Sequence, residues 1–152
     1  PEAEIKLDNL SKCLEEAYLL YFNTRKDIKL NLIKPENDIY FHFDTLQISR
    51  CFSNLIKNAI EAVEKIPNPA VEVLMITDDK NIKIEIKDNG VGIDEKMLSK
   101  IFEPYFTTKT KGTGLGLSIV KRIIEDHGGK IKIEKNKNMA GTTSLINFEY
   151  NA

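Results

Sequence analysis

The chain has 152 residues, of which 41% are hydrophobic and 30% are charged, and its formal net charge is −1. This balance is typical of a globular domain and excludes a basic surface that would hold nucleic acid by charge alone. No apolar run approaches the roughly 20 residues that a membrane-spanning helix needs. We therefore expect one domain over residues 1–152, with a sizeable core and no nucleic-acid partner.

The first 43 residues predict a helix followed by two strands. Asp8 is a candidate N-cap for the helix, because apolar residues recur after it at the spacing of one helical face. These residues are Leu10, Leu14, Ala17, Tyr18, Tyr21 and Phe22. Apolar and polar residues then alternate over 28–32 and over 39–43, which predicts two strands.

A long helix is predicted from Asp44, a second candidate N-cap, to about Lys65, and Pro67 ends it. Its expected core face consists of Phe52, Leu55, Ile56, Ala59, Ile60 and Val63. Cys13 and Cys51 fall within the apolar patterns of the two helices and have no CxxC neighbour. We therefore expect buried free thiols at both positions.

The next part of the chain predicts a hairpin, a loop and a polar segment. Residues 71–76 and 82–87 carry strand patterns on either side of a polar turn, and the loop 88–92 carries two glycines. Residues 94–113 predict a short helix and then a polar stretch.

The last part predicts a helix from near Gly114 to His127, because Gly128 suits the left-handed position that follows a helix. Residues 131–133 and 144–148 predict a closing hairpin. Together these elements predict an α+β two-layer sandwich, in which three main helices cover one face of a mixed, mostly antiparallel sheet of about five strands.

Four polar residues share a narrow arc of the long helix beside its apolar face: Asn54, Asn58, Glu61 and Lys65. Asparagine is a mediocre helix former, so two of them four residues apart need a reason. One interpretation is a solvated face or hydrogen bonding between side chains. The other is an amide oxygen offered to Mg²⁺, which takes hard oxygen ligands and keeps several waters.

Asp88 ends a strand of alternating isoleucines and precedes Gly90 and Gly92. On its own, this pattern fits an ordinary turn. As a binding site, the carboxylate would accept a hydrogen bond from an adenine amino group, and the glycines would let the ring lie against the backbone. A buried carboxylate needs such a donor.

Gly112, Gly114 and Gly116 alternate just before an apolar helical pattern. The loop does not match a Walker loop, because no Lys-Ser or Lys-Thr pair follows these glycines. It matches neither the Rossmann fingerprint nor the protein-kinase loop, because Leu117 stands where glycine is required. The remaining interpretation is a loop whose N–H groups point at an anion, such as a phosphate, at the start of a helix.

Taken together and in this order, these motifs closely resemble the catalytic ATP-binding domain of bacterial two-component sensor histidine kinases, within the gyrase, Hsp90, histidine kinase and MutL superfamily. The matching segments are 54–59 (N box), 88–92 (G1 box), 101–109 (F box), 112–117 (G2 box) and 141–143 (G3 region). The resemblance extends from about Leu7 to Phe148. It implies the Bergerat-type form of the sandwich, with an ATP lid at about 94–113.

The resemblance also implies residue roles. Asn54, Asn58 and Lys109 would be catalytic, Asn58 would be the Mg²⁺ ligand, and Lys109 or Lys111 would reach the terminal phosphates. Asp88 would read the adenine amino group. The residues expected to bind ATP or ADP are Asn58, Glu61, Ala62, Asp88, Gly90, Gly92, Ile93, Phe106, Thr107, Lys111, Gly112, Gly114, Leu115, Gly116, Leu117 and Thr142.

Two features of the pattern concern the phosphates and the lid. Many members of the family carry a lysine or arginine where this chain has Glu61, so the cation that contacts the phosphates is left open. The F box places aromatic residues at the base of the lid, and we expect Phe102, Tyr105 or Phe106 to anchor it against the body of the domain.

The implied activity is that of a protein-histidine kinase, which transfers the γ-phosphate of ATP to a histidine for onward transfer to an aspartate of a response-regulator receiver domain. ATPases of the superfamily carry a glutamate at the position of Asn54 to activate water, and an amide cannot take up that proton. Neither His42 nor His127 lies in a Ser-His-Glu-Leu-Arg-like segment of the kind that the family phosphorylates. We therefore expect the acceptor histidine in the protein's own dimerisation domain, ahead of Pro1. The full-length protein would be a homodimer with this domain in the cytoplasm, whereas the chain alone would be a monomer that does not phosphorylate itself.

Three alternatives remain open: a conformational ATPase of the gyrase or chaperone type, an anti-sigma-factor serine kinase, and a degenerate nucleotide-binding module that only regulates. Steady ATP turnover would favour the first, and a screen of protein substrates would identify the second. Insensitivity to substitution of Asn58 would favour the third. The abundance of lysine over arginine fits a heat-adapted organism or an AT-rich genome.

Overall fold

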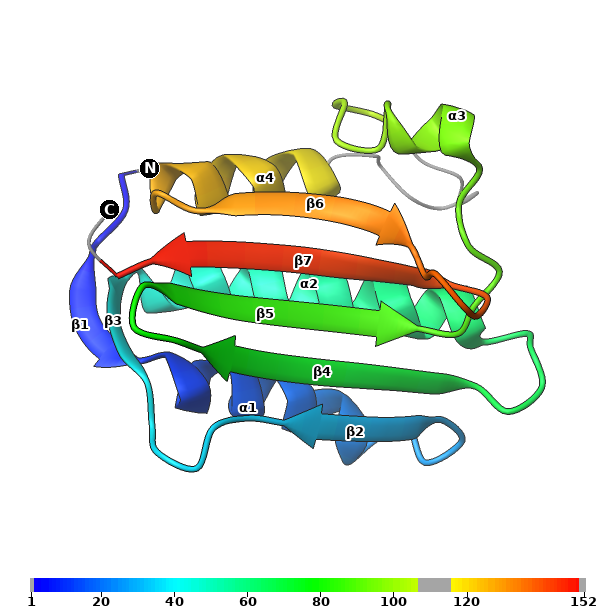
Figure 1. Cartoon of the computed structure of the whole chain (residues 1–152), viewed down its shortest axis with the longest axis horizontal. Helices are drawn as coiled ribbons and strands as arrows, with labels where there is room; N and C mark the ends of the chain where they lie inside the picture. Colours follow the sequence, from blue (N-terminus) through cyan, green and yellow to red (C-terminus); the bar gives the residue numbers. More distant parts are fainter. Residues whose placement is uncertain (1, 107–115, 151–152) are drawn as a thin grey trace.

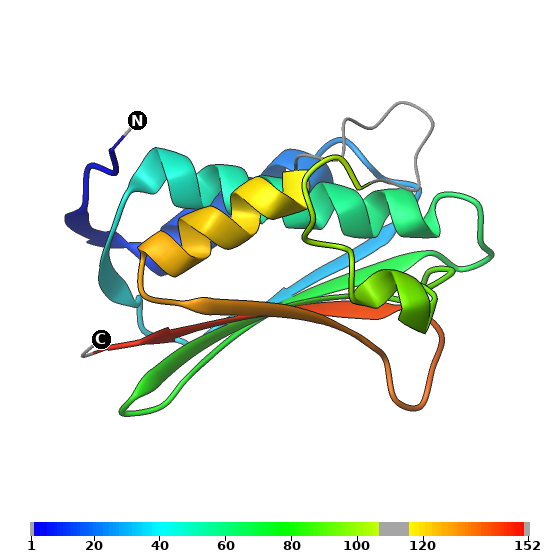
Figure 2. The same cartoon turned by 90° about the horizontal axis from the view of Figure 1, so that it is seen from above.

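The computed structural model describes residues 2–106 and 116–150 of the chain. They form two layers, in which helices cover one face of a twisted sheet (Figures 1 and 2). In chain order the elements are β1 (Lys6–Asn9), α1 (Leu10–Phe22), β2 (Lys29–Ile33), β3 (Tyr40–Phe43), α2 (Thr45–Val63), β4 (Ala70–Thr77), β5 (Asn81–Asp88), α3 (Glu95–Leu98), α4 (Gly116–Asp126), β6 (Lys130–Lys135) and β7 (Thr142–Glu149). The predicted α+β two-layer sandwich is confirmed.

The main sheet has five strands in the order β2-β4-β5-β7-β6. β2 and β4 are parallel, whereas the pairs β4–β5, β5–β7 and β6–β7 are antiparallel. The connection from β2 to β4 contains β3 and α2, which gives the long crossover that a parallel pair requires. The prediction of a mixed, mostly antiparallel sheet is therefore confirmed.

A second, two-stranded sheet consists of β1 and β3, which pair antiparallel with Leu7 opposite His42. β1 was not predicted, because residues 6–9 show no clear alternation of apolar and polar side chains. The strand predicted over 39–43 is present, but it belongs to this small sheet and not to the main one.

The N-cap of α1 is Asn9, whose side chain accepts a hydrogen bond from the Lys12 N–H at 2.9 Å. The prediction of Asp8 as the cap was wrong by one residue. Aspartate and asparagine cap helices equally well, so the sequence alone does not choose between them. Asp8 lies in β1 instead, where its Oδ2 accepts a hydrogen bond from the Thr45 hydroxyl at 2.6 Å.

α2 is the central helix of its layer and lies between α1 and α4 (Figures 1 and 2). Its N-cap is Asp44, as predicted, and the Oδ1 of Asp44 accepts a hydrogen bond from the Gln47 N–H at 3.0 Å. The predicted core face of α2 is buried throughout: Phe52, Leu55, Ile56, Ala59, Ile60 and Val63. Each large apolar side chain buried there contributes roughly 1.5–3 kcal/mol to folding. The helix that carries the polar arc is therefore also the centre of the core.

Cys13 of α1 and Cys51 of α2 lie in this core as free thiols, which confirms the prediction. Burial raises the pKa of each thiol to about 12. Within the described residues, every helix is too short or too polar to cross a membrane.

The C-terminal end of α4 is bonded to the start of α2. Gly128 has φ = 76°, the left-handed conformation predicted for it. His127 is buried, its Nδ1 lies 2.8 Å from the Ile123 carbonyl oxygen, and its Nε2 accepts a hydrogen bond from the Asp44 N–H at 3.0 Å. A carbonyl only accepts and a backbone N–H only donates, so these partners require the neutral ring with its proton on Nδ1.

Replacing His127 with alanine is expected to lower the free energy of unfolding by about 2–3 kcal/mol, because it leaves the Asp44 N–H buried without a partner and opens a small cavity. Denaturant unfolding would measure the loss. His42→Ala, at the chain's other histidine, is the matched control because His42 is exposed, and it should stay within about 0.5 kcal/mol of the wild type. Equal losses in the two variants would contradict a structural role for the His127–Asp44 bond.

Candidate functional site

Segments that are far apart in the sequence meet at one end of the sandwich, opposite β1 and β3 (Figure 1). They are the end of β5 with the loop that follows it, the second half of α2, the start of α4 and the β6–β7 hairpin. Gly90 of the loop approaches Ala62 of α2, and Gly116 of α4 approaches Asn54 of α2. The structure thus brings the described part of the N, G1, G2 and G3 segments together.

Asp88, the last residue of β5, places a buried carboxylate at this end, with only 6% of the residue exposed. Its Oδ1 accepts hydrogen bonds from the Gly90 N–H at 2.9 Å and the Thr142 N–H at 3.3 Å. Burial raises the pKa of Asp88, and these two N–H groups oppose the rise. A carboxylate has about four acceptor positions, so Asp88 can still accept from a ligand. Its burial favours a ligand that offers an N–H donor, as the amino group of adenine does.

The loop after β5 lies directly on α2, because position 90 has no side chain. A Cβ at Gly90 would lie 2.4 Å from the Ala62 carbonyl oxygen. The Val91 N–H donates a hydrogen bond to that same oxygen at 3.4 Å. Gly92, with φ = 78°, follows, and then the half-buried Ile93. The predicted binding residues of α2 and of this loop are therefore neighbours.

The amide pair of α2 faces the start of α4. Asn58 Nδ2 donates a hydrogen bond to Asn54 Oδ1 at 3.1 Å, so the predicted polar arc contains a bonded i, i+4 pair. A Cβ at Gly116, the first residue of α4, would lie 2.8 Å from Asn54 Nδ2. Glycine thus lets the N-terminus of α4, whose N–H groups and dipole favour anions, come within contact of α2. This arrangement fits a phosphate group, and the amide oxygen of Asn58 is the kind of hard ligand that Mg²⁺ prefers.

Glu61, Phe106 and Leu117, which the sequence analysis also named, are half-buried. The pKa of Tyr21 is raised, mainly by burial and to a smaller extent by the nearby Glu61 carboxylate. Leu117 packs against the core, and the Phe106 N–H donates a hydrogen bond to the Glu103 carbonyl oxygen at 3.2 Å. Contact of these three residues with a nucleotide stays a prediction.

The base of the predicted lid is held by Ile101 and Phe102. Ile101 is only 5% exposed, and Lys121 Nζ of α4 lies 5.3 Å from the centre of the Phe102 ring. Tyr105, named as an alternative anchor, is 75% exposed and has φ = 66°, so it does not anchor the segment. Six residues of the sequence-based predictions lie outside the described residues: Thr107, Lys109, Lys111, Gly112, Gly114 and Leu115.

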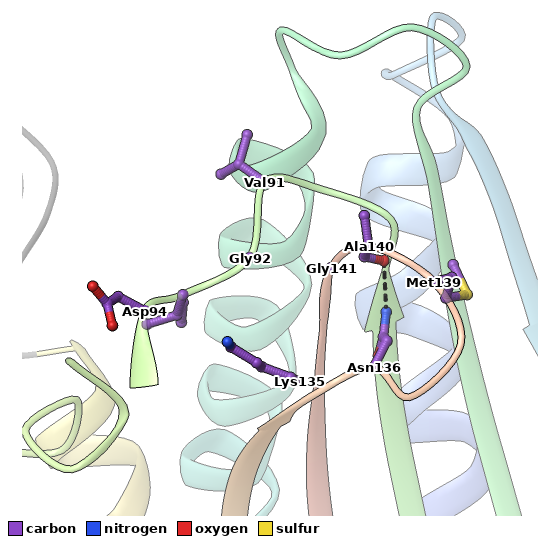
Figure 3. Close-up of a pocket in the computed structure, with 9 residues that line it drawn as sticks. Val91, Gly92, Asp94, Lys135, Asn136, Met139, Ala140 and Gly141 are labelled. Carbon is purple, nitrogen blue, oxygen red and sulfur yellow. Dashed lines mark hydrogen bonds between the residues drawn. The ribbon is translucent and has the colours of Figure 1, made fainter. Parts of the chain in front are cut away.

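Asn136, just after β6, belongs to this end of the molecule and was not predicted. Its Nδ2 donates hydrogen bonds to the Asp88 carbonyl oxygen at 2.7 Å and to the Ala140 carbonyl oxygen at 3.1 Å, the second of which is drawn in Figure 3. Asparagine in turns often bonds nearby backbone, so its place in the predicted turn was the available signal. The bond to Asp88 spans 48 residues and had no signal in the sequence.

A hollow of about 330 Å³ lies beside this turn, lined by 91–94 on one side and by Lys135, Asn136 and 139–141 on the other (Figure 3). Lys135 Nζ also lies 3.7 Å from Glu95 Oε1, which links the hairpin to α3. Among the predicted nucleotide contacts that the structure describes, only Gly92 and Ile93 line the hollow. Within 2–106 and 116–150, no group of three or more His, Cys, Asp or Glu side chains is placed to hold a metal ion.

Comparison with known proteins gives one family. The family model for histidine kinase-, DNA gyrase B- and HSP90-like ATPases matches residues 43–151. The chain is 40% identical over 143 residues to sporulation kinase A of Bacillus subtilis (strain 168), covering 92% of this chain and 23% of that protein. It is 33% identical over 148 residues to the sensor protein FixL of Bradyrhizobium diazoefficiens, covering 93% of this chain and 28% of that protein. The chain thus spans about a quarter of the length of these relatives.

Solved structures give the same family. The nucleotide-free catalytic domain of the histidine kinase ThkA matches with a TM-score of 0.85 and 33% identity, covering 97% of this chain and 96% of that one. ThkA in complex with the response regulator protein TrrA matches with a TM-score of 0.81 and 29% identity, covering 96% of this chain and 42% of that one. The fold, the arrangement of the boxes and these matches agree, and the chain belongs to the histidine kinase-, DNA gyrase B- and HSP90-like ATPase family.

Proposed function

We propose that the chain binds ATP together with Mg²⁺ and presents the γ-phosphate for transfer to a histidine in a dimerisation domain of the full-length protein. The observation that carries the proposal is the buried Asp88 carboxylate, at the same end of the fold as the Asn54–Asn58 pair and the start of α4. A carboxylate suited to an amino group and a helix N-terminus suited to phosphate match the two ends of an adenine nucleotide.

Asn58 would hold the magnesium ion, and the bound ion would neutralise charge on the phosphates. Asn54 orients the Asn58 amide through their 3.1 Å hydrogen bond. The first N–H groups of α4 would hold phosphate oxygens, which Gly116 allows to come close to α2. Phosphoryl transfer is mostly positioning and electrostatics, so the chain need supply no covalent intermediate.

Transfer is favoured over hydrolysis because Asn54 stands where the superfamily's ATPases carry a glutamate, and an amide cannot take a proton from water. His127 is buried and has partners on both ring nitrogens, so it does not suit the role of acceptor. The proposed partners are the protein's own histidine-bearing dimerisation domain and a response-regulator receiver domain. The existence of a solved ThkA–TrrA complex supports the second partner. The full-length protein would be a homodimer, and the chain alone a monomer.

Replacing Asn58 with alanine tests the proposal. The affinity for ADP should fall by about 10- to 100-fold when Mg²⁺ is present, a size typical of disturbing a metal site. Without Mg²⁺ the variant and the wild type should bind ADP about equally, because Asn58 contributes to ADP binding only through the ion that it holds. Calorimetric titration with ADP, with and without Mg²⁺, measures both values.

Lys57→Ala is the matched control, since Lys57 lies next to Asn58 on the exposed side of α2. It should bind ADP as the wild type does under both conditions. A wild-type chain that takes up no adenine nucleotide at millimolar concentration would contradict the proposal. An Asn58→Ala variant that keeps its full response to Mg²⁺ would contradict the assignment of the ligand.

A further inference from the structure

The end of β5 is tied to the β6–β7 hairpin by a side chain. The pairing of β5 with β7 stops at Lys87, opposite Thr143, one residue before Asp88. At that point the side chain of Asn136 replaces the strand pairing: its Nδ2 donates a hydrogen bond to the Asp88 carbonyl oxygen at 2.7 Å. Since Asp88 is buried, its carbonyl needs such a donor, and the side-chain amide supplies what strand pairing no longer does.

Asn136 is itself held in place within the hairpin. Its other Nδ2 bond goes to the Ala140 carbonyl oxygen at 3.1 Å, and its Oδ1 accepts from the Thr143 hydroxyl at 2.5 Å. Its backbone N–H donates to the Gly141 carbonyl oxygen at 3.0 Å. Both ends of the amide and the backbone are thus engaged, so the group that contacts Asp88 cannot rotate without losing several bonds.

The carboxylate of Asp88 is bound from the same hairpin. The Thr142 N–H lies 3.3 Å from Asp88 Oδ1, only six residues along the chain from Asn136. The hairpin therefore contacts Asp88 at two points, at the carbonyl through Asn136 and at the carboxylate through Thr142. Because the hairpin holds both the carbonyl and the carboxylate of Asp88, it fixes the direction in which the carboxylate faces a ligand.

We propose that Asn136 is a positioning residue for recognition of the base: it holds Asp88 so that the carboxylate meets the exocyclic amino group of adenine. This inference rests on the proposed function. It implies a loss of selectivity when Asn136 is changed, because only a base that carries an amino donor gains from the position of the carboxylate.

The test compares Asn136→Ala with the wild type in competition experiments with ADP and IDP against a fluorescent nucleotide. IDP has a carbonyl oxygen in place of the adenine amino group, so it lacks the amino donor from which the Asp88 carboxylate would accept. The affinity for ADP should fall about five- to tenfold, as for one lost hydrogen bond, and that for IDP by less than about twofold. The preference for ADP over IDP therefore falls in the variant.

Asn147→Ala is the matched control, because Asn147 Nδ2 donates to Asn81 Oδ1 at 3.0 Å at the other end of the β5–β7 pair. It removes the same kind of bond and should leave the preference unchanged. If Asn136→Ala does not fold, Thr143→Val removes the hydroxyl that orients the Asn136 amide, and it should lower the preference in the same direction.

An equal loss of affinity for both nucleotides, or no loss for either, would overturn the inference and leave Asn136 as a structural residue only. A wild type that prefers ADP, together with a variant that keeps the full preference, would overturn this inference but not the proposed function. A wild type without any preference for ADP over IDP would overturn the adenine-reading role of Asp88 and this inference with it.

Discussion

Replacing Asp88 with asparagine is expected to lower the affinity for ADP by about 100-fold, the size of a lost charge-assisted hydrogen bond together with an unpaired donor. The amide oxygen of the new side chain can still accept from the Gly90 and Thr142 N–H groups. That orientation turns its NH₂ group toward the adenine amino group, and two donors then face each other. Calorimetric titration with ADP measures the loss.

The same variant should be at least as stable as the wild type near neutral pH when no nucleotide is present. Burial raises the pKa of Asp88 above its ordinary value of 3.8, so folding favours the protonated carboxyl. The stability that this group contributes is complete below its ordinary pKa and is lost as the pH rises through the raised one. The amide introduced by Asp88→Asn does not titrate, so the stability of the variant relative to the wild type should increase as the pH rises from about 4 to 7. Denaturant unfolding at several pH values would reveal the trend, and a decrease would contradict it.

Asp78→Asn is the matched control for Asp88→Asn. The Oδ1 of Asp78 also accepts two backbone N–H bonds, from Lys80 at 2.8 Å and from Asn81 at 2.7 Å, but in an exposed turn. This substitution should leave the affinity for ADP unchanged. A comparable loss of binding in both variants would show that general damage, and not the chemistry of Asp88, explains the result.

Replacing Gly141 with alanine is expected to lower the free energy of unfolding by about 3 kcal/mol or more, through a disfavoured backbone conformation and a steric clash. Gly141 has φ = 106°, and a Cβ there would lie 2.0 Å from the Asp88 carbonyl oxygen. The backbone fixes the position of the Cβ, and the atom that it meets is a backbone oxygen, so no side-chain rotation relieves the clash. A chain of this size should lose about 2–4 °C in melting temperature for each kcal/mol, which thermal unfolding would measure.

Gly92→Ala separates the two causes. Gly92 also has positive φ, 78°, but the nearest atoms to a Cβ there are 4.0 Å away. This control should lose only the cost of the backbone conformation, about 1 kcal/mol. If Gly141→Ala is no less stable than Gly92→Ala, the contact with Asp88 is not a constraint on the fold.

Local patterns predicted most of the fold. The apolar face of α2 and its cap at Asp44 follow from helical periodicity and N-cap chemistry, and both are present. The turn around Gly128 follows from the need for a left-handed residue after a helix, and its φ of 76° agrees. β1 could not be predicted, because its pairing with β3 depends on a partner more than 30 residues away and not on its own pattern.

The candidate site was predictable where chemistry and spacing fall within one element. Asn54 and Asn58 are four residues apart on one helix, so their hydrogen bond follows from helical geometry. The approach of Gly116 to Asn54 and the bond from Asn136 to Asp88 depend instead on how distant elements pack. No local pattern encodes such contacts. The sequence therefore indicated Gly116 as a binding residue through its glycine motif, but it could not identify Asn136.

α4 is fastened to α2 at both ends, by the packing of Gly116 on Asn54 and by the bond between His127 and Asp44. The span between these two fixings is about 16 Å at the rise of an α-helix. Because α4 is held at two points, it cannot slide along α2. A displacement of its first turn therefore requires either a rotation of the helix about its C-terminal end at His127 or a bend in the helix. The length of α4 sets the distance between these two contacts, so one inserted residue would turn His127 by about 100° away from Asp44.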